Sequence, residues 1–207
     1  ESAVLVPDLG SDVVWIVQYD SAQGLVGDPG VACELLAGTG PRHAAFHPSK
    51  NVLLVLAELA ATLCFFATDD AGRPTGPLVG TVYVLPPGLF QRPSHDVATA
   101  AALRVSNNAA YCSIRVVGAD GHVCCVPLDE DGAPQDKSTA WVGSEGLVPR
   151  EINLVRGGSR LLVANQDSHT IRAFDVHPDT GLLSRTASSD LLSTRSPVCI
   201  VELPDHV

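Results

Sequence analysis

Gly40-Pro-Arg-His-Ala-Ala-Phe-His-Pro48, followed by an apolar run at 52–57 and by Glu58, is one copy of a unit that recurs along the chain. Four apolar, strand-like segments each end in a polar residue, and these residues are Asp8, Glu58, Arg115 and Gln166. A second segment with alternating apolar residues follows each of them, at 13–19, 62–67, 123–128 and 170–176. Strand pairs that repeat at a period of roughly 50 residues are typical of radially repeated sheets.

A further strand-like segment precedes three of these pairs, at 41–46, 100–105 and 149–154, and another stands at 197–203. We interpret these segments as the first, innermost strands of four-stranded antiparallel blades joined by turns. The sequence therefore predicts an all-β fold, a single β-propeller portion over residues 1–207. Its predicted parts are strands two to four of one blade at 3–40, whole blades at 41–99, 100–148 and 149–196, and the first strand of a closing blade at 197–203.

The repeat also predicts where polar side chains meet. Equivalent positions of successive blades lie at the same height around the propeller axis, because a rotation relates each blade to the next. The four strand-end residues are therefore expected in one polar ring: Asp8, Glu58, Arg115 and Gln166. The inner strands add further polar residues to the same set, namely Arg42, His43, Arg150 and Glu151. The predicted outcome is a channel mouth lined by carboxylate, guanidinium and imidazole groups.

Composition excludes two classes of partner. The net charge of −10 argues against nucleic acid, because a phosphate backbone is bound by clusters of Lys and Arg that this chain lacks. A membrane is also not expected as a partner, since the longest apolar stretch, 51–67, is interrupted by Glu58 and reads as a strand pair.

The six cysteines mostly lie inside apolar strand patterns and have no paired metal-ligand spacing. We expect buried, reduced thiols, no metal site and no cofactor, and a reducing compartment such as the cytoplasm. Cys124 and Cys125 are adjacent, so they are expected on opposite faces of a strand. The chain begins at Glu1 and contains no Met, so we expect further sequence upstream, where any targeting segment would lie.

Ordered motifs across nearly the whole chain resemble the seven-bladed β-propeller lactonases, which include 6-phosphogluconolactonase and the carboxy-cis,cis-muconate lactonising enzyme. The matching segments include Val6-Pro-Asp-Leu-Gly10, Gly40-Pro-Arg-His43, Ala57-Glu-Leu59, Leu85-Pro-Pro-Gly88, Pro149-Arg150, 161–168 and Ser196-Pro-Val-Cys199. The resemblance implies that about four of seven blades are present, as the C-terminal portion of the propeller. The amino-terminal blades are then expected from the same or a separate chain.

The resemblance also implies a site and an activity. It places His43 and Glu58 in acid/base roles and Arg115 and Arg150 as ligands of an anionic substrate, to which we add Gln166 from the ring. Lactone hydrolysis needs a base for water and donors for the oxyanion, and a carboxylate beside an imidazole is expected to favour the charged imidazole. The implied substrate is a small anionic lactone or sugar phosphate such as 6-phosphogluconolactone, in carbohydrate metabolism and the pentose phosphate pathway.

Two other functions stay open at this point. The same arginines would hold the carboxylates of a muconate-type diacid in a lactonising cycloisomerase. A non-catalytic propeller scaffold or subunit is the alternative from another class. The chain departs from the family pattern at Ala102, where the family has an acidic residue, and at Glu151, where it has glycine.

Overall fold

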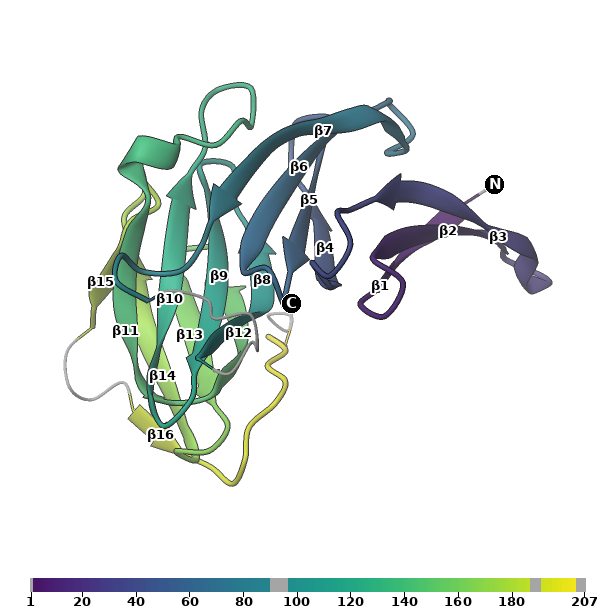
Figure 1. Ribbon diagram of the computed structural model, residues 1–207. Coiled ribbons are helices and arrows are strands. Elements are labelled where there is room, and N and C mark those ends of the chain that lie inside the picture. Colours follow the sequence, from purple (N-terminus) through teal and green to yellow (C-terminus); the bar gives the residue numbers. More distant parts are fainter. Residues whose placement is uncertain (1, 90–96, 187–190, 204–207) are drawn as a thin grey trace.

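The computed structural model of the chain consists of four antiparallel β-sheets that stand side by side (Figure 1). It describes residues 2–89, 97–186 and 191–203. Within these ranges the one helical element is a 3-10 turn, η1 (Asp136–Ser138).

The strands of each sheet follow one another in chain order as a meander. The first two sheets contain β1 (Ser2–Asp8), β2 (Val13–Asp20) and β3 (Gly24–Glu34), then β4 (Pro41–Phe46), β5 (Val52–Ala57), β6 (Thr62–Thr68) and β7 (Pro74–Tyr83). The third sheet contains β8 (Ala98–Val105), β9 (Ala109–Val116), β10 (Ala119–Pro127) and β11 (Ala140–Leu147). The fourth contains β12 (Pro149–Val155), β13 (Arg160–Asn165) and β14 (Thr170–Val176), with β15 (Leu183–Arg185) and β16 (Leu191–Ser193) both paired to β14.

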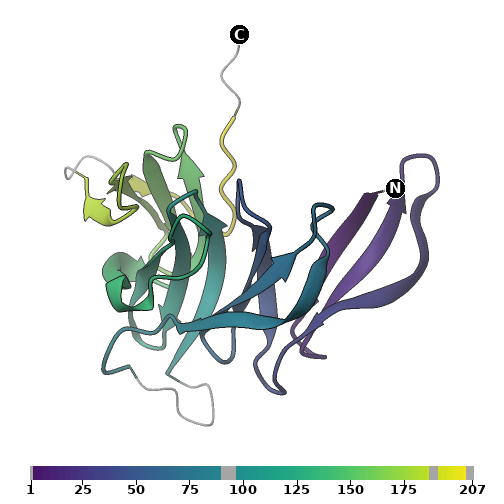
Figure 2. The same cartoon turned by 90° about the horizontal axis from the view of Figure 1, so that it is seen from above.

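Contacts between sheets show the radial arrangement. The first strands β4, β8 and β12 lie next to one another, and the second strand of one sheet contacts the first strand of the next, as β5 contacts β8. Seen from above, the sheets fan out from these inner strands (Figure 2). This is the arrangement of propeller blades, so the prediction of an all-β propeller of four-stranded antiparallel blades is confirmed.

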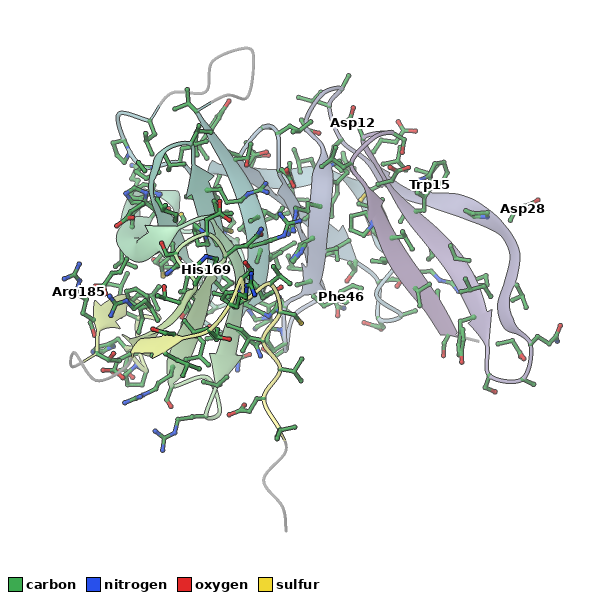
Figure 3. All side chains as sticks on the ribbon, turned by 90° about the horizontal axis from the view of Figure 1, so that it is seen from below. Asp12, Trp15, Asp28, Phe46, His169 and Arg185 are labelled. Atoms are coloured by element: carbon green, nitrogen blue, oxygen red, sulfur yellow. The ribbon has the colours of Figure 1, made fainter. Side chains whose placement is uncertain are left out.

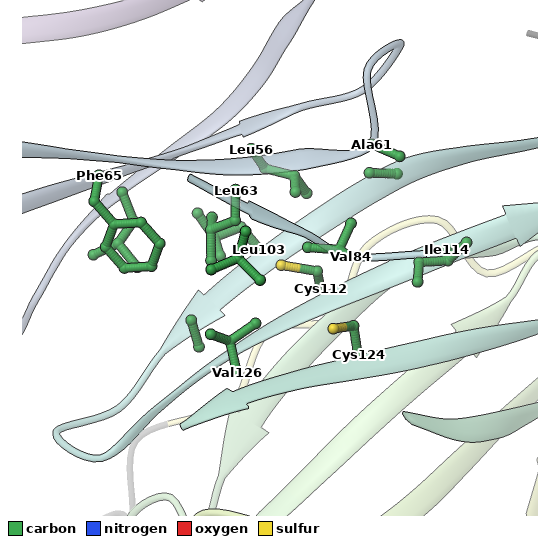
Figure 4. Packing of buried hydrophobic residues seen from close by; sticks show 14 of the residues in the cluster. Leu56, Ala61, Leu63, Phe65, Val84, Leu103, Cys112, Ile114, Cys124 and Val126 are labelled. Carbon is green, nitrogen blue, oxygen red and sulfur yellow. The ribbon is translucent and has the colours of Figure 1, made fainter. Parts of the chain in front are cut away.

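The core lies between the blades and explains the continuous apolar runs of the sequence. Alternate residues of β5 face opposite sides: Leu54 and Leu56 join the cluster shared with the third sheet, whereas Leu53 and Val55 join the cluster shared with the first. Figure 4 shows the former cluster, in which Leu56 and Leu63 pack near Leu103 and Cys112. A strand buried on both faces has no polar side, which is why 52–57 reads as unbroken apolar sequence.

Residues 197–203 differ from their predicted state. They were expected to form the first strand of a further blade, but they form no strand, because a strand needs hydrogen-bonded neighbours and no described strand pairs with them. The segment is still held beside the inner strand β12. Directly before the segment, Ser196 N donates to His169 Nδ1 at 3.1 Å, and near its end Glu202 Oε1 accepts from Arg156 N at 2.8 Å. The blade boundaries given above stay a prediction.

The cysteines are free, and five of them are buried: Cys33, Cys64, Cys112, Cys124 and Cys125. Cys124 and Cys125 lie in different core clusters, as expected for neighbours on one strand. Cys199 is exposed. Burial raises the pKa of Cys33 to about 11 and that of Cys125 to about 12, so their reactive thiolate forms are scarce at neutral pH.

We therefore predict that an aromatic disulfide reagent at pH 7.5 modifies one thiol of the native protein quickly and the other five only after denaturation. The rate is followed by absorbance, and Cys199→Ser should abolish the fast phase. Any fast thiol in that variant would contradict the packing described above.

Candidate active site

A recurring backbone hydrogen bond defines equivalent positions in three blades. Glu58 N donates to Gly40 O at 2.7 Å, Val117 N to Val97 O at 3.0 Å, and Gln166 N to Val148 O at 2.9 Å. Each bond joins the residue before an inner strand to the turn after the second strand. Glu58 and Gln166 are thus equivalent, as predicted.

Arg115 is not equivalent to them, which corrects the predicted register. Val117 occupies the position of Glu58, and Arg115 lies two residues earlier in β9. The reason is the turn: β9 and β10 are joined by two residues, whereas four residues join β5 to β6 and β13 to β14. Because side chains alternate between the two faces of a strand, a shift of two residues leaves Arg115 on the expected face of β9, where it still reaches Glu58.

Gly40 and two bulges place the arginines of the inner strands. Gly40 has φ of +66°, and a Cβ at this position would lie 2.8 Å from Leu59 Cγ, so no other residue fits without movement. The register of β4 against β5 shifts between Pro41 and His43, and that of β12 against β13 shifts between Pro149 and Glu151. Arg42 and Arg150 are the extra residues at these bulges, which re-aim side chains in many sheets.

Glu58 bridges two arginines from neighbouring blades. Its Oε2 lies 3.0 Å from Arg42 Nε, and its Oε1 lies 2.7 Å from Arg115 Nη2. Arg42 also donates to the carbonyl of Ala101, and Arg115 Nη2 donates to that of Ala100 at 3.1 Å, so both guanidinium groups are fixed to β8. Burial lowers the pKa of Arg42, and the charges of Arg115 and Arg150 lower it further, against the opposing effect of Glu58.

His43 is surrounded by donors. Its Nε2 lies 2.7 Å from Arg42 Nη1, and its Nδ1 lies 3.3 Å from Leu103 N. Burial lowers the pKa of His43 to about 4, and the positive charges of Arg42 and Arg104 contribute to the shift. The expectation of a charged imidazole beside Glu58 is therefore wrong: with this lowered pKa the ring is neutral at pH 7, first because it is buried and then because the group that contacts it is Arg42, the partner of Glu58.

A second ion pair extends the cluster towards the last blade. Arg104 Nη2 lies 2.8 Å from Glu151 Oε1, and Arg104 Nε donates to Asn153 Oδ1 at 2.9 Å. Glu151, noted above as a departure from the family, is thus the counter-ion of an arginine next to His43. Ala102, the other departure, is fully buried in the apolar cluster between the third and fourth blades and contributes no charge to the site.

The structure brings His43, Glu58 and Arg115 into one connected cluster. Arg150 lies near enough for its charge to lower the pKa of Arg42, and none of the described residues pairs with its guanidinium group. Gln166 is half-buried on the last blade, and its Oε1 is buried without a partner among the described residues.

The sequence did not reveal the central role of Arg42 or the participation of Arg104. The repeated Pro-Arg at 41–42 and 149–150 was a usable signal for Arg42.

The cluster is positive in a negative protein. It contains four arginines and two glutamates, which leaves two uncompensated positive charges: Arg42, Arg104, Arg115 and Arg150 against Glu58 and Glu151. The whole chain has a formal net charge of −10. Such a local excess attracts an anionic ligand.

Two further observations concern other kinds of site. In the part of the chain that the structure describes, no three His, Cys, Asp or Glu side chains are grouped so as to hold a metal ion. Within the same residues, no helix has the length and apolar character needed to cross a membrane.

Comparison with known proteins identifies the family. A family model described as "Lactonase, 7-bladed beta-propeller" matches residues 1–202. The chain belongs to this lactonase family. Among curated relatives, a 6-phosphogluconolactonase of Sodalis glossinidius is 28% identical over 185 residues, covering 88% of this chain and 52% of that protein. A protein of Arthroderma benhamiae named probable 6-phosphogluconolactonase is 26% identical over 207 residues, covering 95% of this chain and 50% of its own length.

Solved structures agree with this assignment. The periplasmic gluconolactonase of Pseudomonas aeruginosa matches with a TM-score of 0.76 and 26% identity, over 95% of this chain and 52% of that one. A Lactobacillus plantarum protein at 24% identity and a TM-score of 0.77 has the same fold. The chain spans about half the length of the relatives that it matches.

We predict that His43 titrates with a pKa of about 4 and stays neutral from pH 8 to pH 5, as measured by NMR of its ring protons, with His43→Asn to assign the signal. In the unfolded chain the ring takes up its proton near pH 6.5, so the free energy of unfolding should fall as pH drops from 6.5 to 4, by roughly 3 kcal/mol. The slope should be weaker in His43→Asn. An imidazole that titrates near 6.5 in the folded protein would contradict the donor-lined environment.

Proposed function

We propose that the chain forms the active site of a lactone hydrolase that acts on a sugar-phosphate lactone such as 6-phosphogluconolactone. The observation that carries the proposal is the pair of uncompensated positive charges around Arg42 and Arg150, in a chain of the lactonase family. An anionic group on the substrate supplies the missing counter-charge. Arg42 and Arg150 would bind it, with Arg115 and Gln166 as neighbouring ligands of the substrate.

The proposed chemistry begins with a water molecule that attacks the lactone carbonyl. A base must take a proton from this water, and donors must stabilise the oxyanion. His43 is neutral, so one of its two ring nitrogens has a lone pair for that proton, but in the free protein Arg42 Nη1 lies against Nε2 and Leu103 N against Nδ1. A substrate anion that binds Arg42 would offset its charge and compete for its N–H groups, which raises the basicity of His43 only when substrate is present.

In this proposal Glu58 positions the arginines and does not act as the acid/base residue expected from the sequence. Both of its oxygens are paired with guanidinium groups, Oε2 with that of Arg42 and Oε1 with that of Arg115, so both oxygens are occupied in the free protein. We assign it the orientation of Arg42 and Arg115. His43 is then the acid/base residue of the pair, and Glu58 acts through the arginines.

Two finer points belong to the same proposal. The buried reduced thiols fit a reducing compartment, which supports a cytoplasmic enzyme, and a 6-phosphogluconolactonase would act in the pentose phosphate pathway. A muconate-type lactonising activity is the second candidate, because the same arginines suit a substrate with carboxylates.

The test is a side-by-side assay of the purified protein with 6-phosphogluconolactone and a muconate lactone. We expect hydrolysis of the former, and Arg150→Ala should lower kcat/KM by about 10- to 100-fold, since a hydrogen bond to a charged group contributes about 1.5–3 kcal/mol. Arg185→Ala is the matched control, because Arg185, on β15 of the last blade (Figure 3), pairs with Glu145 of β11 and with no residue of the cluster among those described.

Turnover no faster than the uncatalysed reaction with 6-phosphogluconolactone would overturn the proposed function. Turnover of the muconate lactone alone would favour the second candidate. Equal activity of Arg150→Ala and Arg185→Ala would remove the role given to Arg150.

A further inference from the structure

A groove of about 350 Å³ lies beside the ion-pair cluster, between the third and fourth blades. Residues of β8, β9 and the turn after it form one wall, and the other wall is formed by Val148 and Asp167. Its volume is at the lower end of the range for small-molecule sites. Arg115 is part of both the groove and the cluster, so the two are adjacent.

The groove has polar groups of both hydrogen-bonding kinds. The guanidinium group of Arg115 uses only Nη2 in its bonds to Glu58 and Ala100, so the donors on Nη1 have no partner among the described residues, whereas Nε is buried without a partner. Asp167 contributes an exposed carboxylate, an acceptor with no side-chain partner among the same residues. Thr99 contributes a hydroxyl, which both donates and accepts.

The charge of the groove differs from that of the cluster. Thr99 follows the recurring backbone bond by two residues, as Arg42 and Arg150 do in the neighbouring blades, but it pairs with Arg115 in regular register and does not stand at a bulge. The third blade thus has a neutral side chain where the other two have a cation. Asp167 adds a negative charge, and the charge of Arg115 is already met by Glu58. An anion is disfavoured here.

The remaining lining is apolar. Ala98, Val116 and Val148 line the groove, and Val117 is exposed at its edge with 73% of its surface accessible. Apolar surface with donors and acceptors beside it matches a polyol, whose C–H groups pack on the former while each hydroxyl donates one hydrogen bond and accepts others.

We propose that this groove binds the uncharged, hydroxyl-bearing carbons of a sugar substrate, next to the anion site at Arg42 and Arg150. The inference rests on the proposed function for its substrate class. Asp167 accepts hydrogen bonds from substrate hydroxyls, Arg115 donates to their oxygens, and Thr99 does either. Thr99 and Asp167 are therefore specificity-determining residues, which distinguish polyhydroxylated lactones from lactones of the same charge without hydroxyls.

The test uses D-sorbitol, an uncharged polyol, and inorganic phosphate, an anion without carbon-bound hydroxyls, as probes followed by ligand-observed NMR. Asp167→Asn and Thr99→Val should each weaken the apparent affinity for sorbitol by about tenfold and leave phosphate binding unchanged. Asp28→Asn, on the exposed outer strand of the first sheet, is the control and should change neither (Figure 3). Thermal melts of all three variants confirm that they fold.

The proposal that the groove binds hydroxyl groups would be overturned if sorbitol does not bind, or if neither variant changes the affinity for sorbitol. Phosphate binding lost with Thr99→Val would also overturn it, because the groove would then be an anion site. If the protein binds sorbitol through Asp167 but hydrolyses no lactone, the groove proposal stands and the proposed function fails. If the protein hydrolyses 6-phosphogluconolactone and both variants have an unchanged KM, the proposed function stands and the groove proposal fails.

Discussion

The carboxylate of Glu58 between Arg42 and Arg115 is the interaction on which the rest of the site depends. It is about four-fifths buried, with 18% of its side chain exposed, and it compensates guanidinium groups supplied by two different blades. Removing one partner of a buried pair is costly because the other charge is left without compensation. With Glu58 in place, Arg42 is aimed at His43, which keeps the imidazole neutral, and the charge of Arg150 remains available for a ligand.

The fold produces this interaction through its repeat. Inner strands of successive blades lie next to one another, so Arg42 on β4 and the backbone of β8 meet although they are about 60 residues apart in sequence. The recurring bond from the turn to the start of the inner strand holds each blade at the same height. Gly40 and Val148 both adopt positive φ at that start, of 66° and 54°. Left-handed backbone is costly for a β-branched residue, so at Val148 the strain is sustained by the surrounding blade.

The fold was predictable from sequence because its signals are local. Strands that are buried on both faces have unbroken apolar sequence, and the regular spacing of these runs along the chain predicts the blades. The site was predictable in part. Arg115 reaches Glu58 as expected, but its register was wrong because a two-residue turn at Val117 and Gly118 replaces four residues elsewhere. The protonation state of His43 was not predictable, since its lowered pKa depends first on burial and then on the charges of Arg42 and Arg104. Arg104 comes from another blade and follows a bulge of β8 that no sequence pattern indicates.

The most direct measurement compares Glu58→Gln with Glu145→Gln in stability and in kcat/KM. Glu145 is a matched residue, with 21% of its side chain exposed and two arginine partners, Arg172 and Arg185, outside the cluster. Both variants should lose about 2–3 kcal/mol of unfolding free energy. Only Glu58→Gln should also lose activity, by at least about tenfold. Equal activity of the two variants at equal stability would show that the Glu58 bridge serves the fold alone and would contradict this account of the site.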